Sequence, residues 1–172
     1  VELYNPGSTS VDLSGYSLTD NDEPRRLVIS GGTLLGPGAY RVFRNSEAGS
    51  GGLDRLSFPL DSDGETLVLL NPSGERVDVV RFGPQVTQRS LARDGTGQWV
   101  LAHPTPGTAN QPLVAAELST ALTINEFQIL PSRGSPWIEL HNADWRPASL
   151  AGWSLVTSNS AIPLNTISFV EP

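Results

Sequence analysis

The sequence contains no cysteine and no lysine, and each absence excludes a class of function. Without cysteine the chain can form no disulfide, no thiol nucleophile and no thiolate metal site. Without lysine it cannot complete the G-x-x-x-x-G-K-[ST] phosphate-binding loop. Charged residues are only 17% of the total, too few for the outer faces of long amphipathic helices. No apolar run approaches the ~18 residues of a membrane-spanning helix, so we expect no membrane insertion.

What the sequence does contain is typical of short strands joined by tight turns. The 172 residues include 17 glycines and 14 prolines, which punctuate short apolar runs. Turn signals about 8–12 residues apart indicate a β-sandwich or a small barrel. A helical turn is expected only within Glu117–Leu122. The predicted strands between the ends of the chain are Leu27–Ile29, Ala39–Phe43, Asp54–Phe58, Thr66–Leu70 and Val77–Phe82.

An internal repeat organises the chain. Val1–Thr19 reappears as Ile138–Val156, with Glu, Leu, Asn, Leu, Gly, Ser and Leu shared in order. A strand-like segment, Leu122–Leu130, precedes the second copy, whereas the first copy begins without one. We therefore predict a first domain at 1–113 that lacks its first strand, a linker at 114–121, and the N-terminal half of a second copy at 122–172. This organisation predicts an excerpt of a larger protein.

An ordered series of motifs runs along both copies. These motifs are Glu2–Asn5, Asp12–Leu18, Gly32–Gly38, Asp94–Trp99, Thr105–Asn110, Ile124–Glu126 and Trp137–Asn142. Their order resembles that of the lamin tail domain as found in bacterial extracellular proteins. The resemblance implies an all-β, immunoglobulin-like β-sandwich without catalytic residues. It also implies an exported, multi-domain bacterial protein located outside the cell or at the cell surface.

The absent first strand predicts an exposed sheet edge that something must cover. Leu122–Leu130 of the same chain could fold back onto the first copy, or a second chain could supply the strand and form an oligomer. We therefore expect a non-catalytic binding or assembly module, with a protein partner or self-association by strand exchange. The alternative is a targeting module that brings an attached hydrolase or nuclease to DNA, a glycan or another polymer. A net charge of -7 weakens the DNA alternative, because it repels phosphate backbones.

One acidic turn is a candidate calcium site. Asp61, Asp63 and Glu65 alternate carboxylates across a glycine turn, and Ca²⁺ prefers six to eight oxygen ligands. The alternative interpretation is a hairpin turn in which aspartate binds its own backbone. Asp20, Asp22 and Glu23 form a second acidic cluster with the same alternatives. No other cofactor is expected.

Four arginines flank two neighbouring predicted strands and form a candidate binding patch. Such a patch could bind a phosphate or an acidic polymer, but arginines on a sheet face more often pair with nearby carboxylates. The residues of this patch are Arg25, Arg26, Arg41 and Arg44.

Trp145 is the best candidate for an exposed binding aromatic. It lies in a polar loop, A-D-W-R-P, at a position where the first copy has small residues. Exposed aromatic side chains of this kind are often found at binding sites. The other tryptophans discussed here, Trp99, Trp137 and Trp153, are expected in the core or between sheets.

The remaining polar residues argue against catalysis. His141 occupies the place of Tyr4, and an essential base would not be exchanged for tyrosine between copies. His103 lies in a loop between turn-forming residues, and no serine stands in a nucleophile elbow. We expect Glu2 with Asn5, and Glu139 with Asn142, to hold turn backbone where a strand leaves the sheet.

Overall fold

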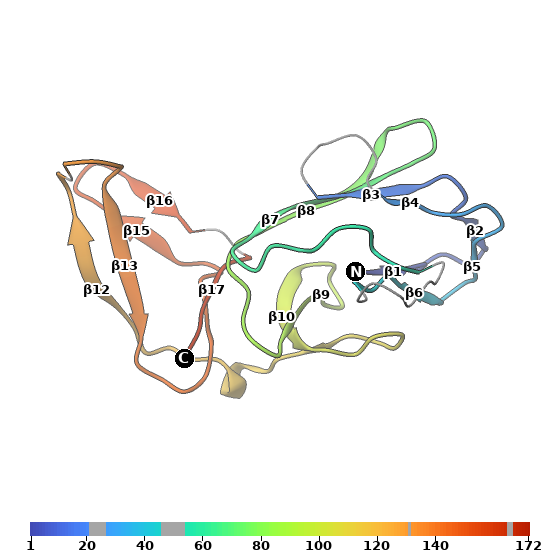
Figure 1. Cartoon of the computed structure of the whole chain (residues 1–172). Helices are drawn as coiled ribbons and strands as arrows, with labels where there is room; N and C mark the ends of the chain where they lie inside the picture. Colours follow the sequence, from blue (N-terminus) through green and yellow to red (C-terminus); the bar gives the residue numbers. More distant parts are fainter. Residues whose placement is uncertain (21–26, 46–53, 131, 165–166) are drawn as a thin grey trace. The chain divides into compact units, whose positions relative to one another are not determined.

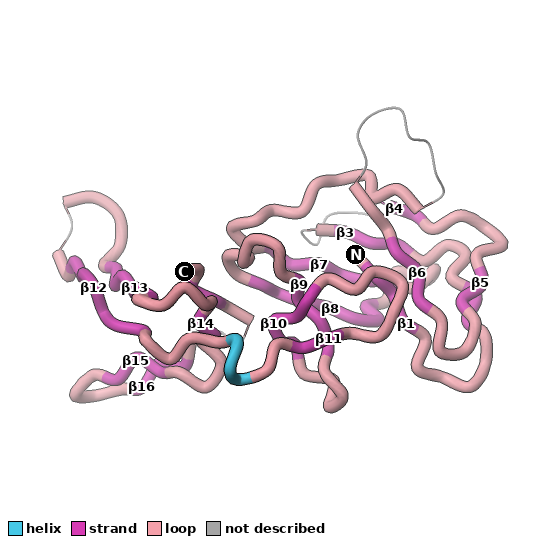
Figure 2. Tube along the Cα trace, turned by 90° about the horizontal axis from the view of Figure 1, so that it is seen from below, coloured by secondary structure: helices cyan, strands magenta, loops and turns pink. Residues whose placement is uncertain are grey.

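The computed structural model describes residues 1–20, 27–45, 54–130, 132–164 and 167–172. The fold is all-β, as predicted, and the only helical element among the described residues is one short 3-10 turn (Figure 2). The chain divides into two compact units, Val1–Phe82 with Thr105–Ala109, and Gly83–Pro104 with Asn110–Pro172. We describe each unit by itself. The predicted domain boundaries stay predictions.

Unit 1 consists of antiparallel strands in three groups (Figure 1). The largest is a sheet in the order β4-β3-β7-β8, and the smaller groups are the pairs β1-β6 and β2-β5. The strands are β1 (Glu2–Tyr4), β2 (Val11–Asp12), β3 (Ser17–Thr19), β4 (Leu27–Val28), β5 (Leu34–Leu35), β6 (Tyr40–Val42), β7 (Glu65–Leu70) and β8 (Arg76–Phe82).

The core of unit 1 confirms most predicted strands and corrects one. Strands β4, β6, β7 and β8 coincide with four of the five predicted segments. The fifth, Asp54–Phe58, is not a strand, and its only ladder contact is the isolated bridge between Arg55 and Arg44. Its Leu56 and Phe58 are nevertheless buried in the core cluster. The β-like composition of this segment therefore reflects burial of side chains from a loop rather than pairing of the backbone.

Unit 2 contains a three-stranded sheet, β11-β10-β9, and three two-stranded pairs, β12-β13, β14-β17 and β15-β16. Its core cluster contains Val86, Leu101, Leu113 and Phe169. Its elements are β9 (Ser90–Arg93), β10 (Trp99–His103), β11 (Gln111–Pro112), the 3-10 turn η1 (Ala115–Glu117), β12 (Leu122–Gln128), β13 (Trp137–Asn142), β14 (Ala148–Ser149), β15 (Ser154–Val156), β16 (Ala161–Pro163) and β17 (Phe169–Val170).

Strand pairs in unit 2 follow the pattern of those in unit 1. Val11 pairs with Leu35 between β2 and β5, and Ala148 pairs with Val170 between β14 and β17. In the same way β3 pairs with β4, and β15 pairs with β16. Two tryptophans of this unit differ from the expectation that they lie in the core or between sheets. Trp137 and Trp153 are each 41% exposed and so do not lie in the core.

A buried asparagine holds the turn between β1 and β2. Asn5 is only 4% exposed, and its Nδ2 donates hydrogen bonds to the carbonyls of Thr9 (2.8 Å), Leu35 (2.9 Å) and Gly36 (3.1 Å). Its Oδ1 accepts a bond from the Gly7 amide at 2.9 Å. One side chain thus ties the turn to the chain at the end of β5, which confirms the predicted turn-holding role.

Asn142 makes the equivalent contacts in unit 2. Its Nδ2 donates to the carbonyls of Arg146 (2.6 Å), Glu171 (3.2 Å) and Val170 (3.5 Å), and its Oδ1 accepts from the Asp144 amide at 3.2 Å. The side chain is again 4% exposed. Each asparagine therefore binds carbonyls of the turn itself and carbonyls near the end of a strand that pairs after the turn.

We predict that Asn5→Ala lowers the free energy of unfolding by about 2 kcal/mol, because it removes the hydrogen bonds by which a buried side chain holds the turn. Asn71→Ala is the matched control. Asn71 holds a similar turn through the amides of Ser73 and Glu75, but in solvent, so the expected loss is only about 0.5 kcal/mol. Urea unfolding monitored by circular dichroism measures both. Equal losses would show that the buried position of Asn5 has no special importance.

Candidate binding surfaces

One edge of strand β1 is open. β1 pairs with β6, and bonds from the Phe43 amide to the Val1 carbonyl (2.7 Å) and from the Asn5 amide to the Ala39 carbonyl (3.1 Å) flank the ladder. Because these groups alternate in direction along an antiparallel strand, the backbone N–H and C=O of Tyr4 face away from β6. Among the described residues, no strand other than β6 pairs with β1. Residues such as Tyr4 thus present an unpaired edge.

The corresponding edge of β13 is covered. His141 of β13 stands where the first copy has Tyr4, and it pairs with Thr123 of β12. The neighbouring amide of Ala143 donates to the Ala121 carbonyl at 3.1 Å, so the backbone groups of His141 face β12. The edge that is open in β1 is therefore the edge that β12 covers in β13.

This pairing corrects one of the two expectations for Leu122–Leu130. The segment does not fold back onto the first copy, because β12 is hydrogen-bonded to β13 along its length. The physical reason is local: a strand joined to its neighbour by a short turn loses less chain entropy on pairing than one that must reach a distant edge. A strand supplied by a second chain stays a prediction.

The β12–β13 hairpin exposes large apolar side chains to solvent. Ile124 and Phe127 of β12 are 60% and 61% exposed, and Ile138 of β13 is 48% exposed. Ile129 and Leu130, which follow β12, are also exposed. Contiguous apolar surface of this kind marks a site where another surface binds.

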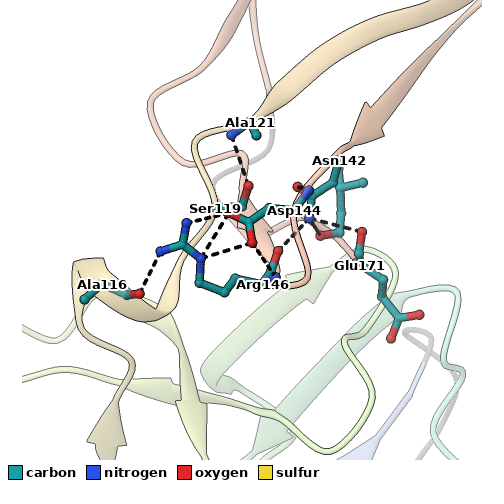
Figure 3. Close-up of polar contacts among 8 residues, drawn as sticks. Ala116, Ser119, Ala121, Asn142, Asp144, Arg146 and Glu171 are labelled. Carbon is teal, nitrogen blue, oxygen red and sulfur yellow. Dashed lines mark hydrogen bonds and ion pairs between the residues drawn. The ribbon is translucent and has the colours of Figure 1, made fainter.

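A second candidate surface surrounds Trp145, in the loop after β13. Asp144 and Arg146 hold this loop from both sides: Arg146 Nε donates to Asp144 Oδ2 at 3.0 Å, and Nη2 also binds Asp144 (Figure 3). Arg146 Nη1 donates to the Ala116 carbonyl at 2.9 Å. The hydrogen bonds from Arg146 lower the pKa of Asp144, and the carboxylate in turn raises the pKa of Arg146. Between these fixed neighbours the Trp145 side chain is 82% exposed, which confirms its predicted exposure.

Trp145 lines an open cavity of about 390 Å³, which the turn Val86–Arg89 also lines. The Arg89 amide donates to the Val86 carbonyl at 3.1 Å and closes this turn. Gln88 has φ 58, and it is the only non-glycine residue with positive φ among those described. Such a conformation costs a residue other than glycine about 1 kcal/mol. The turn therefore retains a glutamine side chain at a position where glycine would relieve strain.

The carboxylates around this cavity are held by hydrogen bonds. Glu117 accepts from the Val114 amide (3.0 Å) and lies 3.0 Å from His103 Nε2, and the Val114 bond is the main cause of its lowered pKa. Glu171 Oε1 accepts from the Thr87 amide at 2.6 Å, which lowers the pKa of Glu171. His103 of β10 is thus in contact with the 3-10 turn through Glu117.

The acidic turn proposed for calcium makes the contacts of a hydrogen-bonded turn. Asp61 Oδ1 accepts from the Asp63 amide at 2.9 Å, and Glu65 Oε1 accepts from the Asp61 amide at 3.0 Å. Within the described ranges, no group of three or more His, Cys, Asp or Glu residues could hold a metal ion. These contacts favour the hairpin interpretation. In the second acidic cluster, Asp22 and Glu23 lie outside the described residues, and Asp20 is buried.

Of the four arginines of the predicted patch, Arg41 and Arg44 lie within the described residues. Arg41 forms an ion pair with Asp54, with Nη2 2.6 Å from Oδ1. Arg44 lies in the isolated bridge with Arg55, whereas Arg25 and Arg26 fall outside the described residues. No helix in the described part of the chain is long and apolar enough to cross a membrane.

Sequence reasoning missed the parts of the Trp145 cavity that come from elsewhere in the chain. The spacing of Asp144 and Arg146 around Trp145 was a usable signal, because an acid and a base two residues apart can pair across a loop. Nothing in the sequence placed Gln88 or Glu117 beside that loop, because both depend on tertiary packing.

We predict that Asp144→Asn lowers Tm at neutral pH, because the amide loses the charged pair with Arg146. The folded pKa of Asp144 is depressed, so its contribution is present above the unfolded pKa and is lost as pH falls through the folded one. The difference in Tm between variant and parent should therefore shrink below about pH 3. Calorimetry across pH measures it. Trp145→Ala, which keeps the ion pair, should show no such pH-dependent difference, and a constant difference for Asp144→Asn would contradict the assignment.

The comparisons with known proteins agree with the fold. Residues 1–84 match the family model described as Lamin Tail Domain. No curated protein and no solved structure matches the chain.

Proposed function

Because residues 1–84 match the family model of the lamin tail domain, we propose that the chain is a non-catalytic binding and assembly module of a larger exported bacterial protein. Lamin tail domains are immunoglobulin-like modules that generally bind or assemble rather than catalyse. In this proposal the module works outside the cell or at its surface, requires no cofactor, and associates with a protein partner or with itself.

Residues 122–172 belong to this proposal as the first half of a second lamin-tail unit. The repeated sequence supports this, and so does the repeated pairing of β14 with β17 and of β15 with β16. The equivalent contacts of Asn5 and Asn142 add support, because a buried amide that binds three carbonyls is sensitive to small changes in backbone path.

Self-association by strand exchange is the form of assembly that the open edge of β1 supports. By the repeat, β12 of a second chain would pair with β1 as it pairs with β13, which places Thr123 opposite Tyr4 and Ile124 opposite Leu3. The exchange conserves the number of strand pairs. It also covers apolar side chains of β12, such as Phe127, that are exposed in its own hairpin, and this burial favours the dimer.

Targeting to DNA has less support. The net charge of -7 opposes binding to phosphate, and Arg41 is neutralised by Asp54.

We predict that the chain dimerises in a concentration-dependent way and that Tyr4→Pro abolishes the dimer. Proline removes the N–H that faces the open edge and spares the bonds that Asn5 makes to β6. Light scattering across a concentration series measures the mass. Phe127→Asp, at an exposed site of β12, should also yield a monomer.

Tyr40→Pro is the matched control. Tyr40 stacks on Tyr4 with ring centroids 4.7 Å apart, so both variants lose the same ring contact, but the Tyr40 amide faces away from β1. This variant should keep the dimer. A monomeric parent at every concentration, or equal behaviour of the two proline variants, would refute strand exchange through β1.

A further inference from the structure

The loop after β13 is built to hold an indole in solvent. In the first copy the equivalent turn, residues 6–10, reads P-G-S-T-S and carries no large side chain. Asn5 and Asn142 support the two turns with the same contacts, so the fold does not require an aromatic residue here. In the second turn, however, the ion pair of Asp144 with Arg146 fixes both neighbours of Trp145 (Figure 3). Comparison of the two copies therefore shows that the asparagine contacts hold the turn, whereas the exposed tryptophan is an addition of the second copy.

The cavity beside this indole has side chains that both donate and accept hydrogen bonds. Arg89 makes one long hydrogen bond, 3.4 Å from Nη1 to the Gln88 carbonyl, which leaves other guanidinium donors for a ligand. The Gln88 amide supplies a donor and an acceptor from a strained position. Glu171 accepts from the Thr87 amide at Oε1 and also bonds the Thr87 side chain, and a carboxylate has lone pairs for a further acceptor contact.

The charged groups around the cavity do not favour an anion. Arg146 is paired with Asp144, and Arg89 shares the lining with the carboxylates of Glu117 and Glu171, so no positive charge is in excess. A volume of about 390 Å³ lies within the usual range for small-molecule sites. The lining thus suits a neutral ligand that has a flat apolar face and a polar perimeter.

We propose that this cavity is a binding site for a neutral saccharide. The C–H face of a pyranose ring stacks on the Trp145 indole, and its hydroxyl groups, which donate and accept, bind Arg89, Gln88 and Glu171. An apolar peptide segment would leave these polar groups unpaired, which costs binding energy. The site lies wholly within unit 2 and does not depend on strand exchange.

The test uses isothermal titration calorimetry of the whole 172-residue chain with three neutral hexasaccharides, those of glucose, mannose and N-acetylglucosamine. At least one should bind, and Trp145→Ala should weaken its affinity by at least about tenfold. Gln88→Gly should also weaken binding while Tm stays equal or rises, because glycine relieves the positive φ. Opposite effects on affinity and Tm distinguish a ligand contact from a purely structural role.

Trp153→Ala is the matched control, because Trp153 is a partly exposed tryptophan of the same unit outside the cavity. The affinity of this variant for the hexasaccharide should equal that of the parent chain. Tm measurements verify that each variant is folded. Failure of all three hexasaccharides to bind, or an unchanged affinity of Trp145→Ala, would overturn the proposal. Binding of decaproline at Trp145 without binding of any hexasaccharide would also overturn it and would assign the site to a peptide.

Discussion

The structure depends on two buried asparagine amides that hold its turns. Several of its strands are only two residues long and provide few backbone hydrogen bonds of their own. Asn5 and Asn142 each bind three backbone carbonyls, within the turn and near the end of a strand that pairs after it. Because a hydrogen bond lost from a buried polar group is costly, one such side chain fixes the path of the backbone between two short strands.

Because the short strands make few backbone hydrogen bonds, an unpaired strand edge is an important feature of this molecule. β1 is paired on one side only, whereas its counterpart β13 has β12 on the equivalent edge. A sheet edge with unpaired amides and carbonyls binds any strand of compatible register, and the repeat itself defines one such register. The apolar side chains of the β12–β13 hairpin add a hydrophobic contribution to any association that covers them.

Features set by local chemistry could be predicted from sequence, and features set by packing could not. The strands at β7 and β8, the turn role of Asn5 and the exposure of Trp145 all follow from patterns within a few residues. Leu56 and Phe58 misled the strand prediction because burial from a loop selects the same residue types as a strand. As a large aromatic residue, Trp153 was expected in the core or between sheets, yet it is 41% exposed. The positive φ of Gln88 has no signal in sequence, since glycine or asparagine is the usual residue there.

In the turn held by Asn142, the contacts that fix the backbone are independent of the side chains that the loop carries. Every contact of the asparagine side chain is made to backbone atoms, so the identities of residues 143–147 are free to change while the turn keeps its path. The first copy carries small residues on this frame and the second carries Asp144, Trp145 and Arg146. The fold can therefore acquire a new recognition surface through substitutions in one loop, while the asparagine that holds the turn is kept. The two copies thus carry loops of different composition on the same backbone turn.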